Sequence, residues 1–108
     1  MSNKALKKSS IKPLSKNALK FLRGIAHDTK PVVTIADKGI TENILLELEV
    51  CLDQHELVKI KIRTDRDARQ QYTTELLKES GAQLVQSIGQ TLTLFRPNPK
   101  KPVFELPK

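Results

Sequence analysis

The chain has 108 residues, which is enough for one domain with an apolar core and no need of disulfides or metal ions. Its 19 Lys and Arg against 12 Asp and Glu give a net charge of +7, which favours a nucleic-acid partner. No apolar run approaches the roughly 20 residues that span a bilayer, and no secretory signal is visible, so we expect a soluble, cytoplasmic protein. We expect the single cysteine, Cys51, to be a small buried hydrophobic residue in a reducing compartment.

The N-terminal part of the chain is basic. Residues 1–14 carry Lys and Ser without an acid and are predicted to form a flexible basic arm, either a solubilising tail or an additional phosphate-binding arm. Ser15 is a suitable N-cap for a first helix that runs to about His27. The predicted apolar face of this helix consists of Ala18, Leu19, Leu22, Ile25 and Ala26. Opposite it lies a cationic stripe of Lys16, Lys20, Arg23 and His27, which we interpret as an electrostatic contact surface rather than an ordinary solvated face.

The centre of the chain, residues 31–62, indicates a strand, a loop, a helix and a second strand. A β-branched run at 32–35 precedes a turn signal at 36–39, and Thr41 is a good N-cap for the helix. The apolar face of this helix consists of Ile44, Leu45, Leu48, Cys51 and Leu52. Strict alternation follows, with Val58, Ile60 and Ile62 on one side of a strand and Lys59, Lys61 and Arg63 on the other. Strands joined by such a helix are parallel, so the 36–39 loop lies at the amino end of a helix, where anions bind.

The outer face of this central helix is predicted to be acidic. Glu42, Glu49 and Glu56 recur at seven-residue spacing, with Glu47 and Asp53 nearby. Such a face repels phosphate, so a nucleic acid would meet the helix end-on at residues 39–41.

The last part of the chain is predicted to form a helix and a hairpin. Thr64 with Asp67 resembles a capping box, and Gly81 ends a third helix whose inner face holds Ala68, Tyr72, Leu76 and Leu77. Arg66 and Arg69 lie in its first turn, against the helix dipole, and are therefore functional candidates. Strands at 84–88 and 91–96 flank a Gly-Gln turn. The proline-rich tail, 97–108, is predicted to be irregular, and whether its apolar residues fold back stays open.

These elements predict a single compact α/β layer domain over residues 15–96. The order is helix-strand-helix-strand-helix-strand-strand, with a four-stranded mixed sheet against which the helices pack. No catalytic motif is visible: there is no P-loop and no nucleophile elbow, and the two histidines have no metal-ligand spacing with Cys51. We therefore expect no enzyme activity, no cofactor and no metal.

Several short runs resemble one known family. They are R-G-I-A-H at 23–27, K-P-V-V at 30–33, K-G-I-T at 38–41, H-E-L-V-K-I-K at 55–61 and L-F-R-P at 94–97. The chain resembles the CRM (chloroplast RNA splicing and ribosome maturation) domain, most closely the single-domain bacterial YhbY-like proteins. The resemblance implies an RNA-binding fold similar to the C-terminal domain of bacterial translation initiation factor three. It also implies association with precursors of the large ribosomal subunit.

The family's RNA-contacting feature is a GxxG loop between the first strand and the central helix. Here the loop is Ala36-Asp37-Lys38-Gly39, so Ala replaces the first glycine, whereas Lys38, Gly39 and the preceding Lys30 match the family. Alanine approaches a phosphate backbone less readily than glycine, and Asp37 adds a negative charge at the same place.

We therefore predict a non-enzymatic, monomeric protein of ribosome biogenesis that binds structured ribosomal RNA or a pre-50S particle. The predicted RNA-binding residues are Lys16, Lys20, Arg23, Lys30, Ala36, Asp37, Lys38, Gly39, Lys59, Lys61, Arg63, Arg66 and Arg69. The alternative is a protein–protein adaptor that uses the acidic face of the central helix. A DNA-binding domain is disfavoured because no groove-reading motif is visible.

Overall fold

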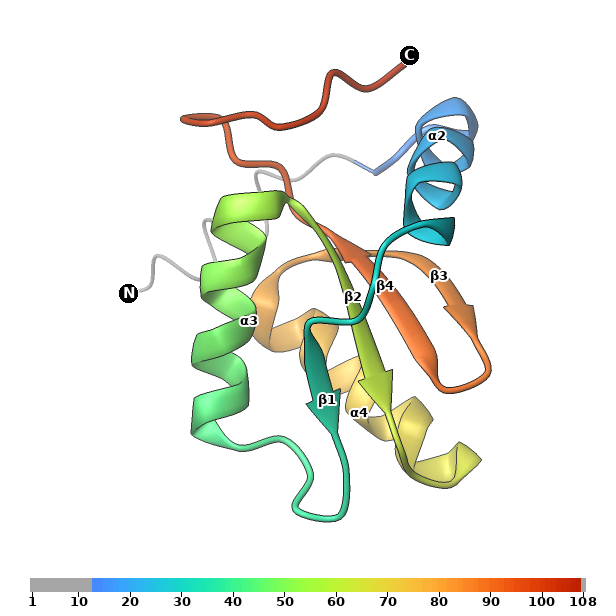
Figure 1. Ribbon diagram of the computed structural model, residues 1–108, viewed down its shortest axis with the longest axis vertical. Helices are drawn as coiled ribbons and strands as arrows, with labels where there is room; N and C mark the ends of the chain where they lie inside the picture. Colours follow the sequence, from blue (N-terminus) through green and yellow to red (C-terminus); the bar gives the residue numbers. More distant parts are fainter. Residues whose placement is uncertain (1–12, 108) are drawn as a thin grey trace.

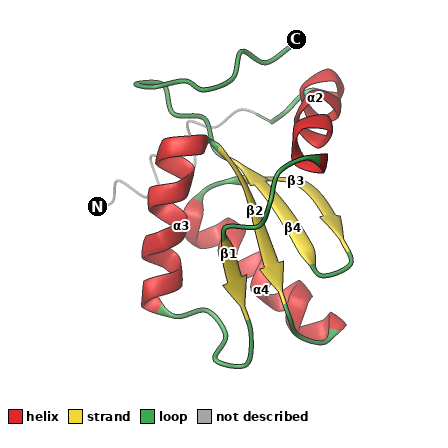
Figure 2. Ribbon diagram, viewed as in Figure 1, coloured by secondary structure: helices red, strands yellow, loops and turns green. Residues whose placement is uncertain are grey.

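The computed structural model of the protein describes residues 13–107, and three helices and four strands alternate along them (Figures 1 and 2). Their order and bounds are α2 (Lys16–His27), β1 (Val33–Ile35), α3 (Glu42–His55), β2 (Leu57–Ile62), α4 (Arg66–Ser80), β3 (Gln83–Ile88) and β4 (Thr91–Phe95). This order confirms the predicted α/β layer domain. The predicted basic arm at 1–14 lies almost entirely outside the described residues.

The four strands form one mixed sheet in the order β1-β2-β4-β3. β1 and β2 are parallel and joined by α3, as the crossover rule predicts. The second crossover runs from β2 through α4 to β3 and leaves one strand position empty between them. β4 fills that position and pairs antiparallel with both β2 and β3. A bulge between Leu84 and Gln86 leaves Val85 as the extra residue of β3.

Helices pack on both faces of the sheet, and each face has its own apolar cluster. Helices α3 and α4 pack on one face, where Ile35, Ile60 and Leu94 belong to the larger cluster with Leu48 of α3 and Leu76 of α4. Helix α2 packs on β2 and β3 at one end of the opposite face, where the smaller cluster lies. That cluster consists of Leu22, Ala26, Leu57, Val85 and Phe95. Within residues 13–107, no helix covers the rest of this second face beyond α2 (Figure 1).

The helix caps show how far local sequence determines the elements. The side chains of Ser15 and Thr41 accept hydrogen bonds from the backbone N–H groups three residues on, as predicted. The prediction of Thr64 as the cap of the third helix is wrong. Asp65 caps α4 instead, because its carboxylate accepts from the Ala68 N–H at 2.8 Å.

The prediction that Glu56 belongs to the acidic outer face of α3 is also wrong. The helix ends at His55, and Glu56 adopts φ +60°, which turns its side chain away from the helical path. The carboxylate is buried and accepts three backbone N–H groups of the C-terminal tail, from Asn98, Val103 and Phe104. A heptad count assumes a continuing helix and therefore misplaces this residue.

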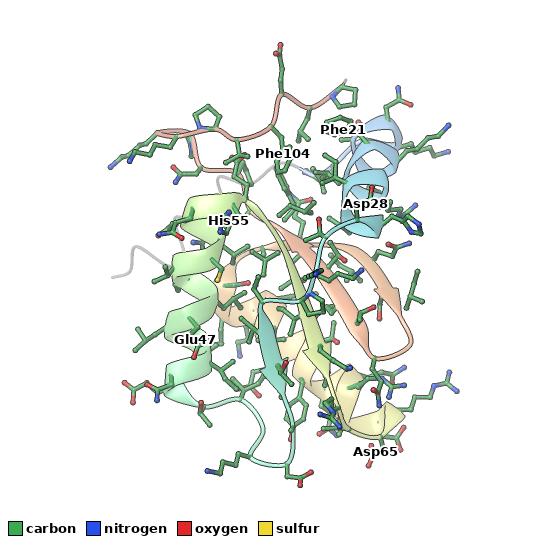
Figure 3. All side chains as sticks on the ribbon, in the orientation of Figure 1. Phe21, Asp28, Glu47, His55, Asp65 and Phe104 are labelled. Carbon is green, nitrogen blue, oxygen red and sulfur yellow. The ribbon has the colours of Figure 1, made fainter. Side chains whose placement is uncertain are left out.

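The tail is irregular in secondary structure, as expected, and it folds back onto the domain over its described part. The Phe104 ring stacks edge-to-face on Phe21 of α2 with 6.3 Å between the ring centroids, and it also lies 6.5 Å from the Phe95 ring (Figure 3). Leu106 joins the same cluster. The tail thus links the end of α3 to the outer side of α2.

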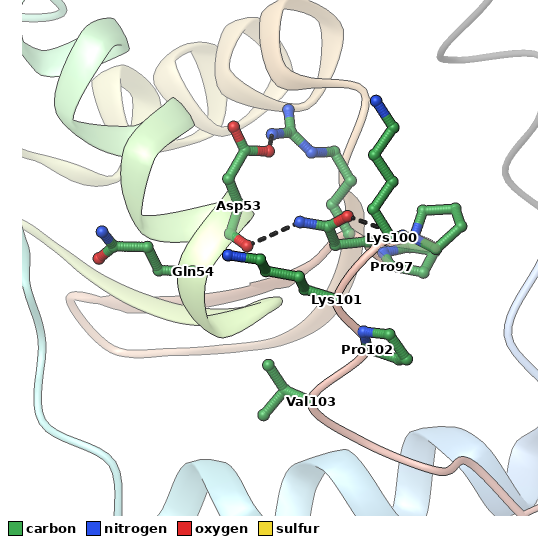
Figure 4. A pocket seen from close by; sticks show the side chains of 10 residues that line it. Asp53, Gln54, Pro97, Lys100, Lys101, Pro102 and Val103 are labelled. Atoms are coloured by element: carbon green, nitrogen blue, oxygen red, sulfur yellow. Dashed lines mark hydrogen bonds and ion pairs between the residues drawn. The ribbon is translucent and has the colours of Figure 1, made fainter.

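Two further acids of α3 are held by a buried arginine. Arg96, only 4% exposed, donates to Glu49 at 2.7 Å and to Asp53 at 2.8 Å, and also to the Ser80 carbonyl. Three of the five acids of the predicted acidic face, Glu49, Asp53 and Glu56, therefore bind groups of the protein itself. An open hollow of about 1090 Å³ lies beside Asp53, beneath the Pro97–Val103 segment (Figure 4), and none of the predicted RNA-binding residues lines it.

Cys51 packs against the larger cluster and is half-buried, close to its predicted environment. Burial raises the pKa of its thiol, and the nearby Glu47 carboxylate raises it further, so the thiol stays protonated and unreactive at neutral pH. None of the helices found in residues 13–107 is long and apolar enough to cross a bilayer.

Candidate nucleic-acid interface

The loop between β1 and α3 is a tight turn. The Gly39 N–H donates to the Ala36 carbonyl at 2.8 Å, and Gly39 has φ +70°. Lys38 and Asp37 are exposed at the tip of this turn. Ala36 does not have a positive φ, so the alanine that replaces the family's first glycine causes no backbone strain.

Gly39 is buried against Tyr72 of α4, a contact that the sequence did not predict. A Cβ atom added at Gly39 would lie 2.9 Å from the Tyr72 hydroxyl oxygen and 3.4 Å from the nearest ring carbons. The glycine is therefore required twice, for its left-handed backbone and for the close approach of the tyrosine. This contact joins the loop to the first half of α4.

Gly39→Ala is expected to lower the free energy of unfolding by about 1–3 kcal/mol, because it adds a strained φ to a steric clash. Urea unfolding would measure the change. The same substitution in a Tyr72→Phe background separates the two causes, since removing the hydroxyl oxygen leaves only contacts of 3.4 Å. We expect the glycine substitution to cost less in that background. An equal cost in both backgrounds would show that the Tyr72 hydroxyl does not limit the site.

A row of cations crosses the sheet face that α2 leaves uncovered. Lys59 and Lys61 of β2 alternate with the buried Val58, Ile60 and Ile62, so they point to the face opposite α3 and α4, and Arg63 continues the alternation. At an axial rise of roughly 3.3 Å per residue, the row spans about 13 Å between its first and last Cα atoms. None of the four strands contains Asp or Glu.

The two ends of this row meet the other predicted basic elements. The Lys59 ammonium donates to the Ala26 carbonyl at 3.1 Å, in the last turn of α2. At the other end, the Arg63 N–H donates to the Ile35 carbonyl at 2.7 Å, directly before the loop that carries Lys38. The segment that contains Lys30 also runs beside β2, because the Val32 N–H donates to the Lys59 carbonyl at 3.0 Å.

Helix α2 and the β1–α3 loop lie at opposite ends of the molecule (Figure 1), with the open sheet face between them. Arg23 of the α2 stripe reaches the sheet, since its Nε donates to the Val85 carbonyl at 3.0 Å. Lys16 and Lys20 are exposed on the earlier turns of the helix. The structure therefore connects α2 to the loop through the β2 row rather than by direct contact.

Arg66 and Arg69 lie on the other side of the sheet. Both line a groove between α4 and the β3–β4 hairpin, together with Ile62 and Leu92 of the larger cluster's face. The Arg69 guanidinium donates to the Thr64 carbonyl at 2.8 Å, so one of its functions is to hold the start of its own helix. The predicted second patch is thus divided, with Lys59, Lys61 and Arg63 on one face and the two α4 arginines on the other.

Hydroxyl groups on β4 accompany the cationic row and were missed from the sequence. Thr93 pairs with Lys59 and Thr91 with Lys61 in the antiparallel register, so the side chains of each pair share a face. The signal was present as the Thr-Leu-Thr-Leu alternation at 91–94, which places both threonines opposite the buried leucines.

The model of the CRS1 / YhbY (CRM) domain family matches residues 14–96, more than three quarters of the chain. The chain belongs to this CRM domain family.

Three bacterial relatives agree with this membership. A protein of Haemophilus influenzae named as an RNA-binding protein is 38% identical over 96 residues, which is 88% of this chain and 96% of the relative. A probable RNA-binding protein of Pseudomonas aeruginosa is 42% identical and covers 81% of this chain and 85% of its own. A probable RNA-binding protein of Bacillus subtilis is 30% identical, with 82% and 93% covered. The prediction of a binding protein rather than an enzyme agrees with these names.

The CRM fold is also seen in a solved structure. The solution structure of a hypothetical protein from Staphylococcus aureus has a TM-score of 0.74 and 27% identity to this chain, and the match covers 88% of this chain and all of the other. The predicted family and the predicted fold class are thereby confirmed.

Proposed function

We propose that this CRM domain binds structured RNA across the open sheet face, and that it does so in assembly of the large ribosomal subunit. The observation that carries the proposal is the β2 row of Lys59, Lys61 and Arg63, which joins the last turn of α2 to the β1–α3 loop. The names of the relatives, which refer to RNA binding, support RNA as the partner. Ribosomal RNA or a pre-50S particle is the specific target that the family resemblance suggests.

Phosphate contacts supply most of the affinity in this proposal. Lys38 holds one stretch of the RNA at the tip of the loop, whose tight turn Gly39 permits, and the β2 row holds the next. Arg23 and Lys30 flank the row, and Lys16 and Lys20 extend the surface along α2. The whole chain has only four aromatic residues, one Tyr and three Phe, so base stacking contributes little and the domain recognises backbone and shape.

The test measures the binding of precursor large-subunit ribosomal RNA by fluorescence anisotropy across a salt series. We expect the affinity to fall steeply with salt, and we expect Lys61→Gln to weaken binding and reduce the slope of log affinity against log salt by about 1. Lys38→Glu should weaken binding further than Lys38→Gln, because it adds repulsion to the lost contact. Lys78→Gln is the matched control, since Lys78 is exposed near the end of α4, away from this surface.

The same series distinguishes the alternatives. An adaptor retains one supporting feature, the exposed apolar pair Leu46 and Val50 on α3, although Glu49, Asp53 and Glu56 interact within the domain. The adaptor would be favoured if the protein bound this RNA no more tightly than an arbitrary polyanion and if all variants bound it with the same affinity. Preference for duplex DNA over RNA in direct competition would favour a DNA-binding domain.

A further inference from the structure

A small hollow of about 270 Å³ lies on the open sheet face, where the last turn of α2 meets the strands. Among the described residues, three cationic or cationisable side chains, two hydroxyls and an amide line it, and no acid does. The lining residues are Arg23, His27, Lys59, Gln86, Ile88, Thr91 and Thr93. Donors thus converge on one point from α2, β2, β3 and β4.

The charged donors of this hollow are held in place before any ligand arrives. Arg23 uses its Nε on the Val85 carbonyl, and its other guanidinium nitrogens remain available as donors. Lys59 uses one ammonium proton on the Ala26 carbonyl, and two protons remain. Side chains that are already ordered lose less conformational entropy when they bind an anion.

Thr93 adds an uncharged donor to the hollow. The residue is only 2% exposed and lines the hollow beside Lys59, its partner in the antiparallel register. The second hydroxyl, that of Thr91, already donates to the Ile88 carbonyl at 2.8 Å. A hydroxyl that opens into the hollow can donate to an oxygen atom of a bound anion.

We propose that this hollow is a binding site for one phosphate group. A tetrahedral anion presents acceptor oxygens in several directions at once, which suits donors that come from four elements, whereas a carboxylate presents two oxygens in one plane. The assignment of this phosphate to RNA rests on the proposed function. A strand of RNA that follows the β2 row passes the hollow at the Lys59 end. Either an internal phosphodiester or a terminal monoester supplies the same chemistry.

The first test uses inorganic phosphate and the full chain, without RNA. Backbone amide NMR at constant ionic strength, with chloride as the replaced anion, should show saturable shifts at Gln86, Thr91 and Thr93. Thr93→Val keeps the shape and every charge, and we expect it to weaken phosphate binding several-fold, on the order of three- to tenfold. Lys59→Gln should weaken it by about tenfold or more, and Lys78→Gln should leave it unchanged. Shifts that do not saturate, or that persist in Thr93→Val and Lys59→Gln, would overturn the site.

The second test uses two short RNAs of the same sequence, one with a 5′-phosphate and one with a 5′-hydroxyl. Tighter binding of the phosphorylated RNA that disappears in Thr93→Val assigns a terminal phosphate to the hollow. Equal binding of both RNAs, with an equal several-fold loss in Thr93→Val, assigns an internal phosphodiester. If the affinity for both RNAs falls steeply with salt and Thr93→Val changes neither affinity, the phosphate site fails while the proposed function stands. If inorganic phosphate binds but neither RNA does, the proposed function fails and the anion site stands.

Discussion

Glu56→Ala is expected to lower the free energy of unfolding by about 2–4 kcal/mol, the largest effect of any exchange considered for this domain. The buried carboxylate accepts from the N–H groups of Asn98, Val103 and Phe104, and hydrogen bonds to a charged acceptor are individually strong. The loss is smaller than three full bonds because a released tail regains water at its donors. Chemical denaturation with urea would measure it.

Matched variants make this prediction specific. Glu56→Gln keeps one acceptor oxygen, which can serve Val103 and Phe104 together, so we expect about half of the loss. Glu105→Ala, at an exposed position of the same tail, should stay within about 0.5 kcal/mol of the parent protein. In Glu56→Ala, trypsin should also cleave sooner after Lys100. If Glu56→Ala and Glu105→Ala unfold alike, the carboxylate does not hold the tail.

Arg96→Met is expected to lower the free energy of unfolding by about 2–3 kcal/mol. The guanidinium is almost fully buried and is hydrogen-bonded to Glu49, Asp53 and the Ser80 carbonyl. Methionine fills much of the space but leaves the carbonyl of the buried Ser80 without this donor. Thermal and urea unfolding would both report the loss.

The partners of Arg96 should matter much less than Arg96 itself. The Glu49 and Asp53 side chains are 38% and 59% exposed, so water can replace the guanidinium there, and we expect Glu49→Gln and Asp53→Asn each to cost under about 1 kcal/mol. Arg96→Lys should retain only part of the stability, because an ammonium cannot reproduce the two-nitrogen fork. If Asp53→Asn cost as much as Arg96→Met, the ion pair and not the buried carbonyl would dominate.

Local patterns in the sequence predicted the elements well. Ser15 and Thr41 are caps because the residues three positions on are already helical, and the alternation at 58–62 gave the correct buried face of β2. Asp65 was missed because Thr64 and Asp65 are both good caps, and the choice between them depends on where β2 stops. The neighbouring strand β1 determines where β2 stops, because the Arg63 N–H still donates to the Ile35 carbonyl at the end of β1.

Contacts between residues far apart in the chain could not be predicted in this way. Glu56 meets the tail more than 40 residues later, and Arg96 reaches 43 residues back to Asp53. The same limit applies to the candidate site. The sequence identified most of its cations, but whether they share a face depended on the position of α2 and on the Lys59–Thr93 register. The sequence also did not show that the two α4 arginines lie on the opposite face of the sheet from this row.

The strand order β1-β2-β4-β3 has a consequence for how the protein is made. β4 is the last strand to be synthesised, yet it forms two of the three strand ladders, one with β2 and one with β3. A nascent chain that has not yet exposed Phe95 holds only the short parallel β1–β2 pair, and β3 has no neighbour at all. Non-local pairing of this kind is slow and offers no stable halfway point. We therefore expect folding to wait until the whole domain has left the ribosome and then to occur in a single cooperative step.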